Sequence, residues 1–246
     1  MRVAAVTGAS RNIGRSIALA LAEQSIAIAC LGRDRPMLDE TVGLVEANGG
    51  RASAHVGDIS DDGSAATFVD QVLEIYERLD VVVNNAGITG EAPSATTDLS
   101  LFRKVIDVNL IGAFALSQAA YPALTRGEDA IIVNVGSIYG QIGVPKFAAY
   151  CASKAALDGL TRALAAEWAR DGIRVVSIAP GYVMSDISAE ALADDRSSQG
   201  IIRRIPQRRV ATADEVGVVV AMLADRRCRY ITGATLVMDG GQISSI

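Results

Sequence analysis

The chain has 246 residues, of which 50% are hydrophobic and 4% aromatic, and its formal net charge is −5. This length allows one large domain or two small ones, and the apolar content is enough for a core that folds alone. The net negative charge argues against nucleic acid and anionic membrane surfaces as partners, because both would repel the chain.

Seven short apolar runs alternate with longer segments in which apolar residues return every three or four positions, as in 12–24 and 62–79. Runs that are apolar throughout are typical of parallel strands covered by helices on both faces. We therefore predict one Rossmann domain over 1–246, with a doubly wound seven-stranded parallel α/β sheet. The expected strands are 2–7, 26–32, 51–56, 79–85, 130–136, 173–179 and 234–239.

The stretch TGASRNIG, from Thr7 to Gly14, joins the first expected strand to a helix that opens near Ile13. The unpaired N–H groups and the dipole of a helix N-terminus suit a pyrophosphate. A glycine-rich turn alone is weak evidence, because many strand-to-helix turns need glycine for backbone reasons only. The strand–loop–helix order nevertheless makes a phosphate site a reasonable hypothesis, with these candidate residues: Gly8, Ser10, Arg11, Asn12, Ile13 and Gly14.

Asn12 stands where such loops usually carry another glycine. If the position requires a positive φ, asparagine is the best non-glycine occupant, because its short polar side chain tolerates the left-handed region. Its side chain also stands where bare backbone would approach a cofactor. We predict that cofactor contact is weakened or reoriented here, and not abolished.

Tyr150 and Lys154 stand four residues apart on a segment of helical character, so both project from one helix face. Ser137 follows the apolar run 130–136, and ligands bind at the carboxyl ends of strands in open α/β sheets. Together these three residues are the strongest functional signal in the sequence.

These motifs resemble the short-chain dehydrogenase/reductase family. Its TGxxxGxG loop matches Thr7, Gly8 and Gly14, and its NNAG element matches the run from Asn84 to Gly87. Ser137 followed thirteen residues later by Tyr150-x-x-x-Lys154, with Asn109 on an intervening helix, matches the catalytic pattern. The resemblance covers nearly the whole chain, which is similar to 3-oxoacyl-[acyl-carrier-protein] reductases and to sugar or polyol dehydrogenases.

The resemblance implies a role for each matching catalytic residue. Tyr150 is expected to be the general acid/base that exchanges a proton with the substrate oxygen, and Ser137 to hydrogen-bond that oxygen. Lys154 is expected to bind the cofactor ribose and, with the positive nicotinamide, to bring the pKa of Tyr150 closer to neutral pH. Asn109 is expected to bind a water that relays protons from Lys154.

The resemblance also assigns further residues to the cofactor cleft. Asp58 and Ile59 follow the third expected strand and are expected beside the adenine ring, although Asp58 could instead cap the next helix near Asp61. The backbone at Val183 is expected to meet the nicotinamide carboxamide, and Ser185 replaces a usual threonine. The remaining candidates are Asn85, Ala86, Gly87, Pro180 and Gly181, with Tyr150 and Lys154 as cofactor contacts too.

The second expected strand carries Gly32 where an NAD-selecting acid would stand, and Arg33 follows. An arginine fork suits a 2′-phosphate, and Arg11 is a second cation within reach, so the pattern favours NADP(H) over NAD(H). The alternative is that Arg33 and Arg35 are solvated loop charges paired with Asp34 and Asp39.

Three cysteines, Cys30, Cys151 and Cys228, share no metal-ligand spacing, so we predict no metal site, and their odd number suits a reducing compartment. The opening segment lacks the features of a signal peptide, and no apolar run approaches the ~20 residues that span a bilayer. We expect a cytoplasmic protein that does not bind membranes.

The long polar segment 185–206 is either a surface excursion or a substrate lid beside a strand end. The segment 148–168 is apolar on more than one face, which indicates burial on both sides. By resemblance we expect a homo-oligomer, a tetramer or a dimer.

The leading functional hypothesis is an NADP(H)-dependent carbonyl reductase that acts on a small carbonyl or alcohol substrate, similar to the 3-oxoacyl reductases. A sugar or polyol dehydrogenase that works toward oxidation, and a non-catalytic dinucleotide sensor, are the alternatives.

Overall fold

The computed structural model describes residues 1–185 and 195–245, and it contains one seven-stranded sheet in the order β3-β2-β1-β4-β5-β6-β7. All neighbouring strands are parallel. The predicted doubly wound parallel sheet is therefore confirmed. The strands are β1 Val3–Thr7, β2 Ala27–Gly32, β3 Ala52–Val56, β4 Val81–Asn84, β5 Ala130–Val135, β6 Ile173–Pro180 and β7 Thr235–Met238.

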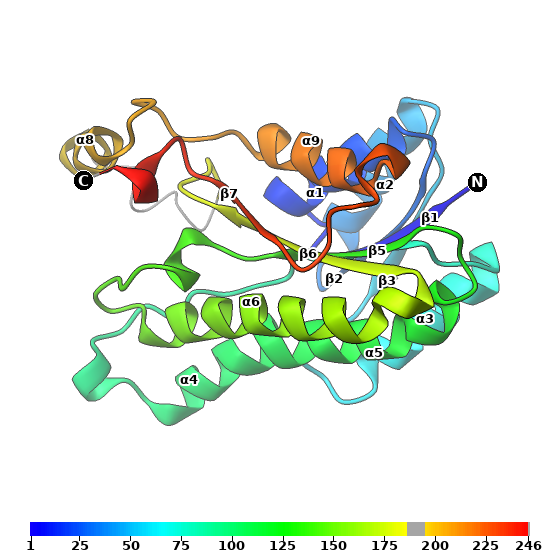
Figure 1. Cartoon of the computed structure of the whole chain (residues 1–246), viewed down its shortest axis with the longest axis horizontal. Coiled ribbons are helices and arrows are strands. Elements are labelled where there is room, and N and C mark those ends of the chain that lie inside the picture. Colours follow the sequence, from blue (N-terminus) through cyan, green and yellow to red (C-terminus); the bar gives the residue numbers. More distant parts are fainter. Residues whose placement is uncertain (186–194, 246) are drawn as a thin grey trace.

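Helices cover both faces of this sheet (Figure 1). One face carries α1 Asn12–Ala22, α2 Arg35–Ala47 and α9 Ala213–Ala224. The other carries α3 Ser64–Tyr76, α5 Gly112–Leu124 and α6 Ala148–Trp168. Two more helices lie toward the carboxyl ends of the strands, α4 Leu99–Ile106 and α8 Asp195–Arg204, and a π-helical turn, Asp107–Ile111, joins α4 to α5.

The strands are apolar throughout because each face of the sheet has its own core. In β1, Ala5 packs in the cluster that includes Phe68 of α3, whereas Val6 packs in the cluster that includes Ile17 of α1. Successive strand side chains point to opposite faces, so both sets must be apolar when both faces are covered. The uninterrupted apolar runs in the sequence are the direct consequence.

Helices α1 and α9 pack closely. A Cβ atom at Gly217 of α9 would lie only 2.6 Å from the backbone oxygen of Ser16, so a larger residue there would force the helices apart. The hydroxyl of Ser16 donates a hydrogen bond to Asp214 at 2.7 Å across the same contact. Because α1 begins in the TGASRNIG loop, this contact holds the loop against the sheet.

The predicted lid, 185–206, is described only in part, because residues 186–194 lie outside the described residues. Helix α8 occupies 195–204, and Ile205 after it is buried. In the described part of the chain, none of the helices is long and apolar enough to cross a membrane.

Asp80 joins three strands at the amino-terminal edge of the sheet. Its carboxylate accepts a hydrogen bond from the Val3 N–H at 2.8 Å and pairs with Arg78 at 2.6 Å. Its backbone bonds to Val3 and Ile131 link β1 and β5. The carboxylate is buried, so its loss leaves the Val3 N–H without a partner.

We predict that Asp80→Ala lowers the free energy of unfolding by about 1–3 kcal/mol, because a buried backbone donor becomes unsatisfied. Urea denaturation measures this change. The control is Asp70→Ala, which removes an exposed carboxylate from α3 and should change stability by less than about 0.5 kcal/mol. Equal stability of the two variants would contradict the role given to Asp80.

Candidate active site

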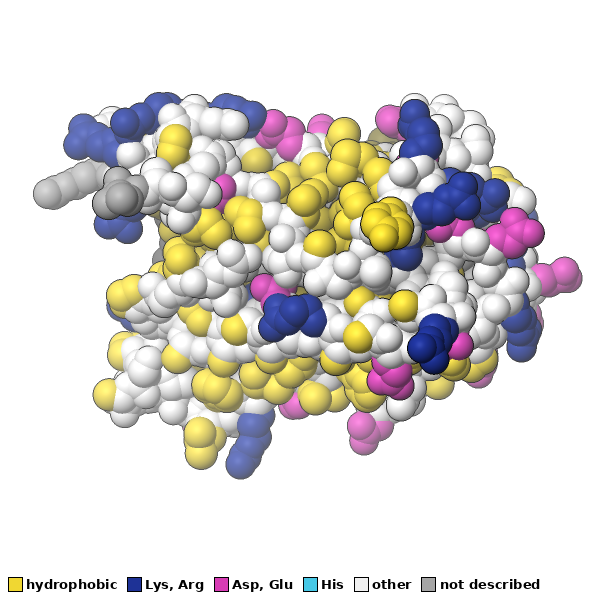
Figure 2. All heavy atoms as spheres, in the orientation of Figure 1, with side chains coloured by type: hydrophobic (Ala, Val, Ile, Leu, Met, Phe, Trp, Pro, Cys, Tyr) yellow, Lys and Arg dark blue, Asp and Glu magenta, His cyan; other side chains and the backbone are white. Residues whose placement is uncertain are grey.

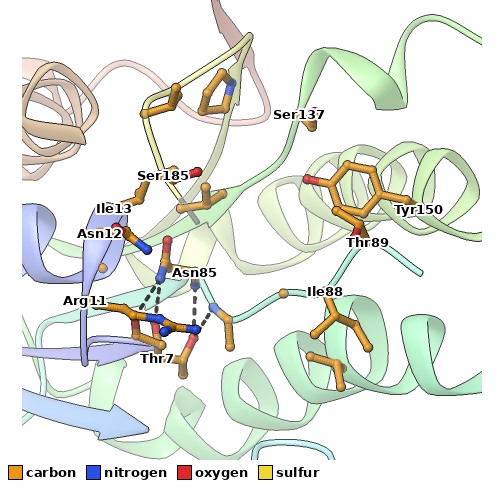
Figure 3. Close-up of a pocket in the computed structure, with 18 of the residues that line it drawn as sticks. Thr7, Arg11, Asn12, Ile13, Asn85, Ile88, Thr89, Ser137, Tyr150 and Ser185 are labelled. Atoms are coloured by element: carbon orange, nitrogen blue, oxygen red, sulfur yellow. Dashed lines mark hydrogen bonds between the residues drawn. The ribbon is translucent and has the colours of Figure 1, made fainter. Parts of the chain in front are cut away.

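A cleft of about 1070 Å³ opens at the carboxyl ends of the strands, where β1, β2, β4, β5 and β6 run into loops. Figure 3 shows side chains from these loops directed into it. Asn109 is the one predicted site residue that does not line the cleft. The residues that do are Gly8, Ser10, Arg11, Asn12, Ile13, Gly14, Arg33, Asp58, Ile59, Asn85, Ala86, Gly87, Ser137, Tyr150, Lys154, Pro180, Gly181, Val183 and Ser185.

The TGASRNIG loop adopts the conformation that its glycines and asparagine allow. Gly8 has a φ of +63°, and Asn12 has a φ of +47°, which is the left-handed region where asparagine is tolerated. A side chain at Gly14 would collide with the Gly8 carbonyl and lie 2.7 Å from the Asn85 amide. The condition stated for Asn12, a positive φ, is therefore met, and the weakened or reoriented cofactor contact stays a prediction.

The start of α1 is suited to an anionic group. Its N-cap residue, Arg11, makes no side-chain capping bond to the helix, and the first turn contains no acidic residue. The first backbone N–H groups of a helix have no partner within it, and the helix dipole favours negative charge beside them. Because Asn12, Ile13 and Gly14 line the cleft, these donors fit the pyrophosphate of a dinucleotide.

Thr7 and Asn85 hold the loop to the end of β4. The Thr7 hydroxyl accepts hydrogen bonds from the backbone N–H groups of Asn85 at 3.0 Å and Ala86 at 2.9 Å. The Asn85 amide donates to the carbonyls of Thr7 at 2.9 Å and Gly8 at 3.2 Å (Figure 3). The NNAG element and the glycine loop are thus one rigid unit.

Asn84 points into the protein, where it joins a buried polar network. Its amide donates to Asn134 of β5 at 2.8 Å and to Ser117 of α5 at 3.1 Å. Asn134 in turn donates to Thr161 of α6 at 2.8 Å. This network fixes α5 and α6, the helix with the candidate catalytic residues, against the centre of the sheet.

At the other end of the cleft, Arg33 pairs with Asp58 at 3.4 Å and is 68% exposed. Burial raises the pKa of Asp58, but hydrogen bonds from Ser60 and the charge of Arg33 outweigh it, so the net shift is downward. Asp58 does not cap the next helix, since α3 begins after Gly63.

The alternative in which Arg33 and Arg35 pair with Asp34 and Asp39 is correct for Arg35 and wrong for Arg33. Arg35 pairs with Asp39 at 2.8 Å, as that alternative expected. Arg33 does not pair with Asp34, because the Asp34 carboxylate caps α2 by accepting from the Met37 N–H.

The three strongest candidates meet at the middle of the cleft. Ser137 follows β5, and α6 carries Tyr150 and Lys154. The Lys154 ammonium donates to the Val135 carbonyl at 2.7 Å and lies 5.5 Å from the centroid of the Tyr150 ring. Figure 3 shows the Tyr150 hydroxyl directed into the cleft beside Ser137. The spacing in the sequence therefore corresponds to convergence in space.

Burial controls the protonation of both groups on α6. It raises the pKa of Tyr150 to about 12, against the effect of a hydrogen bond with Ser137. It lowers the pKa of Lys154 to about 8, against the effect of the Asp158 carboxylate. Burial of the phenolate is thus the larger effect on Tyr150 among these side chains. The expectation that Lys154 and the nicotinamide together bring this pKa closer to neutrality stays a prediction.

Asn109 lies in the π-helical turn, buried behind the cleft. Its amide group donates to the Ile88 carbonyl at 2.9 Å and to the Ser153 hydroxyl at 3.0 Å, and accepts from the Ile88 N–H at 2.8 Å. One donor and the amide oxygen therefore hold the loop after β4, and the other donor bonds to α6. Asn109 and Lys154 approach each other around Gly87, but the proton relay stays a prediction.

An aromatic wall borders the reactive groups, and sequence reasoning missed most of it. Tyr139 packs edge-on against Phe147 and Tyr150, with ring centroids 5.4 and 5.9 Å away, and its hydroxyl is 2.9 Å from that of Tyr182. Tyr182 directly follows Pro180-Gly181, a signal that could have found it. Lys104 also lines the cleft, but it stands in no motif.

Residues 8–242 match a family model described as enoyl-(acyl carrier protein) reductase. A 3-oxoacyl-[acyl-carrier-protein] reductase of Staphylococcus aureus (strain Mu50) is 37% identical over 239 residues, which are 97% of this chain and 96% of that protein.

Solved structures agree with these matches. A proposed short-chain alcohol dehydrogenase from Sinorhizobium meliloti 1021 is 40% identical, with a TM-score of 0.96 over 100% of this chain and 97% of that one. A proposed NAD(P)-dependent gluconate 5-dehydrogenase from Beutenbergia cavernae, solved with bound NADP, is 39% identical, with a TM-score of 0.94 over 99% of this chain and 97% of that one. The chain therefore belongs to the short-chain dehydrogenase/reductase family of oxidoreductases.

Proposed function

We propose that this oxidoreductase is an NADP(H)-dependent carbonyl reductase whose substrates are similar to 3-oxoacyl thioesters. The observation that carries the proposal is the convergence of Ser137, Tyr150 and Lys154 in the same cleft as the phosphate-binding loop. The full-length similarity to a 3-oxoacyl-[acyl-carrier-protein] reductase supports this substrate class. The apolar lining beside Tyr150, from Val144 and Phe147, is compatible with an acyl chain.

In carbonyl reduction each of the three side chains has its own role. The dinucleotide, when bound, supplies the hydride. Tyr150 gives its phenolic proton to the oxygen that becomes a hydroxyl, and Ser137 donates a hydrogen bond to that oxygen as negative charge develops on it. Lys154 binds the ribose and places a positive charge beside Tyr150, which stabilises the phenolate that remains.

The similarity to a gluconate 5-dehydrogenase favours the second candidate, a sugar or polyol dehydrogenase. An assay that monitors the absorbance of the reduced cofactor with a panel of ketoacyl thioesters, sugars and diketones separates the two functions. No turnover of any compound in the panel would favour a dinucleotide sensor.

The preference for NADP(H) is supported by the end of β2. Gly32 supplies no carboxylate where an NAD-selecting acid would stand, and a side chain there would have to displace the Ser10 hydroxyl. Arg33 is exposed at the cleft, and Arg11 lines it too. Both guanidinium groups suit a phosphate dianion.

A homo-oligomer is proposed from two apolar faces. Figure 2 shows apolar side chains gathered over α9 and β7, where Val218, Met222 and Val237 are exposed. A second set on the π-helical turn and α5 includes Ile111, which is 52% exposed, and Phe114. Two such faces on one chain favour a tetramer over a dimer, since each can bury against a second copy.

Tyr150→Phe is expected to reduce kcat by at least about 100-fold, because the proton donor is lost. Fluorescence titration with NADPH should show cofactor affinity nearly unchanged, since the ring stays in place. The matched control is Tyr121→Phe, at a half-buried tyrosine on α5, outside the cleft lining, whose hydroxyl bonds to Asp171. Substantial turnover by Tyr150→Phe would refute the assignment of the general acid.

Arg33→Asp is expected to change cofactor preference by at least about tenfold toward NAD(H), since one charge-assisted contact is worth about 1.5–3 kcal/mol. The measurement is the ratio of kcat/KM values for the two reduced cofactors. Arg35→Asp, at the first residue of α2 and paired with Asp39, should leave the ratio unchanged. Equal use of both cofactors by the unmodified protein would count against the assignment.

Asn12→Gly is expected to strengthen NADPH binding, because it removes a side chain from the cleft while keeping the positive φ. Calorimetric titration measures the dissociation constant. If affinity and the crystallographic position of the cofactor are the same in both proteins, the asparagine does not weaken or reorient the contact.

A further inference from the structure

Asp158 is a buried carboxylate, and one of its oxygen atoms is unpaired among the described residues. It lies on α6 four residues after Lys154, so the two side chains project from one face of the helix, one turn apart. Only 6% of its surface is exposed. Its Oδ1 atom accepts no hydrogen bond from any described residue. This arrangement is unusual because buried polar atoms are nearly always paired.

Asp158 lies near the turn that carries the candidate catalytic Ser137. A Cβ atom at Gly136 would lie 3.5 Å from the Asp158 Oδ1 atom and 2.9 Å from the Ser177 hydroxyl. Gly136 separates Val135, whose carbonyl accepts from Lys154, from the candidate catalytic Ser137. The Oδ1 atom of Asp158 thus lies close to Gly136, in the turn that leads from Val135 to Ser137.

A contribution to the stability of the fold does not explain why a carboxylate stands at this buried position. Burying a carboxylate oxygen without a hydrogen bond costs free energy, so the unpaired Oδ1 atom does not by itself stabilise the fold. Asp158 stands in the interior of α6, so it does not cap the helix. The remaining explanation for Asp158 is the effect of its negative charge on Lys154.

The other groups that face Lys154 are neutral or are backbone atoms. Tyr150 on its own helix is a phenol, and β5 presents the Val135 carbonyl. The π-helical turn presents the Asn109 amide across Gly87. Within the described residues, Asp158 is the one charged group that acts on the Lys154 ammonium.

We propose that Asp158 is a positioning residue for the reaction, whose buried carboxylate keeps Lys154 protonated in the desolvated cleft. The proposal rests on the role of Lys154 given above. Burial lowers the pKa of Lys154 to about 8, and Asp158 raises it against that effect. Without Asp158 the pKa falls further, so that at neutral pH a larger share of Lys154 is uncharged and cannot stabilise the Tyr150 phenolate.

The lysine content of the chain makes a direct test practical. The sequence holds three lysines, Lys104, Lys146 and Lys154. Lysine labelled with ¹³C at the ε carbon therefore gives three NMR resonances, which Lys104→Arg and Lys146→Arg assign. A pH titration of the full chain should place the Lys154 midpoint near the pKa of about 8. In Asp158→Asn we expect that midpoint to fall by about one pH unit or more.

Two controls complete the experiment. Asp107→Asn removes an exposed carboxylate from the neighbouring π-helical turn and should leave the Lys154 midpoint unchanged. If Asp158→Asn does not fold, as judged by circular dichroism, Asp158→Ala takes its place. An unchanged Lys154 midpoint in a folded Asp158 variant overturns the proposal. The titration needs neither cofactor nor substrate, so its failure is distinguishable from failure of the Tyr150→Phe turnover assay.

Discussion

The active-site cleft depends on the hydrogen bonds that the Thr7 hydroxyl makes at the end of β1. Strands β1 and β4 are neighbours in the sheet although β2 and β3 lie between them in the chain, so the loops after them lead away in opposite directions. Ligands bind in open α/β sheets at this kind of reversal. By accepting from the backbone after β4, Thr7 keeps the phosphate loop and the NNAG element at a fixed separation.

A second requirement is the desolvation of the reactive groups. Tyr150 and Lys154 are held on a helix that is packed against the sheet, and burial disfavours the charged form of each. Burial therefore favours the protonated phenol of Tyr150 and the uncharged amine of Lys154, and a buried anion opposes the second effect. Asp158 supplies that anion one helical turn away. In this account, proton transfer is governed as much by the groups behind the cleft as by those within it.

Much of this could be predicted because the determining patterns are local. Continuous apolar runs specify strands covered on both faces, and the spacing of Tyr150 and Lys154 specifies one helix face. The positive φ at Asn12 follows from the residue type in a turn of known shape. What could not be predicted depends on contacts between distant segments. The raised pKa of Tyr150, the pairing of Arg33 with Asp58, and the bonds that hold Asn109 behind the cleft all require knowledge of burial and of neighbours from other elements.

The central claim is that the three side chains meet at the nicotinamide ring of a dinucleotide bound in this cleft. A crystal structure of the chain with NADP⁺ tests this most directly. The account predicts the pyrophosphate at the start of α1, the 2′-phosphate beside Arg33, and the nicotinamide next to Ser137 and Tyr150, with Lys154 on its ribose. A dinucleotide bound elsewhere, or a nicotinamide ring far from the Tyr150 hydroxyl, would contradict the account.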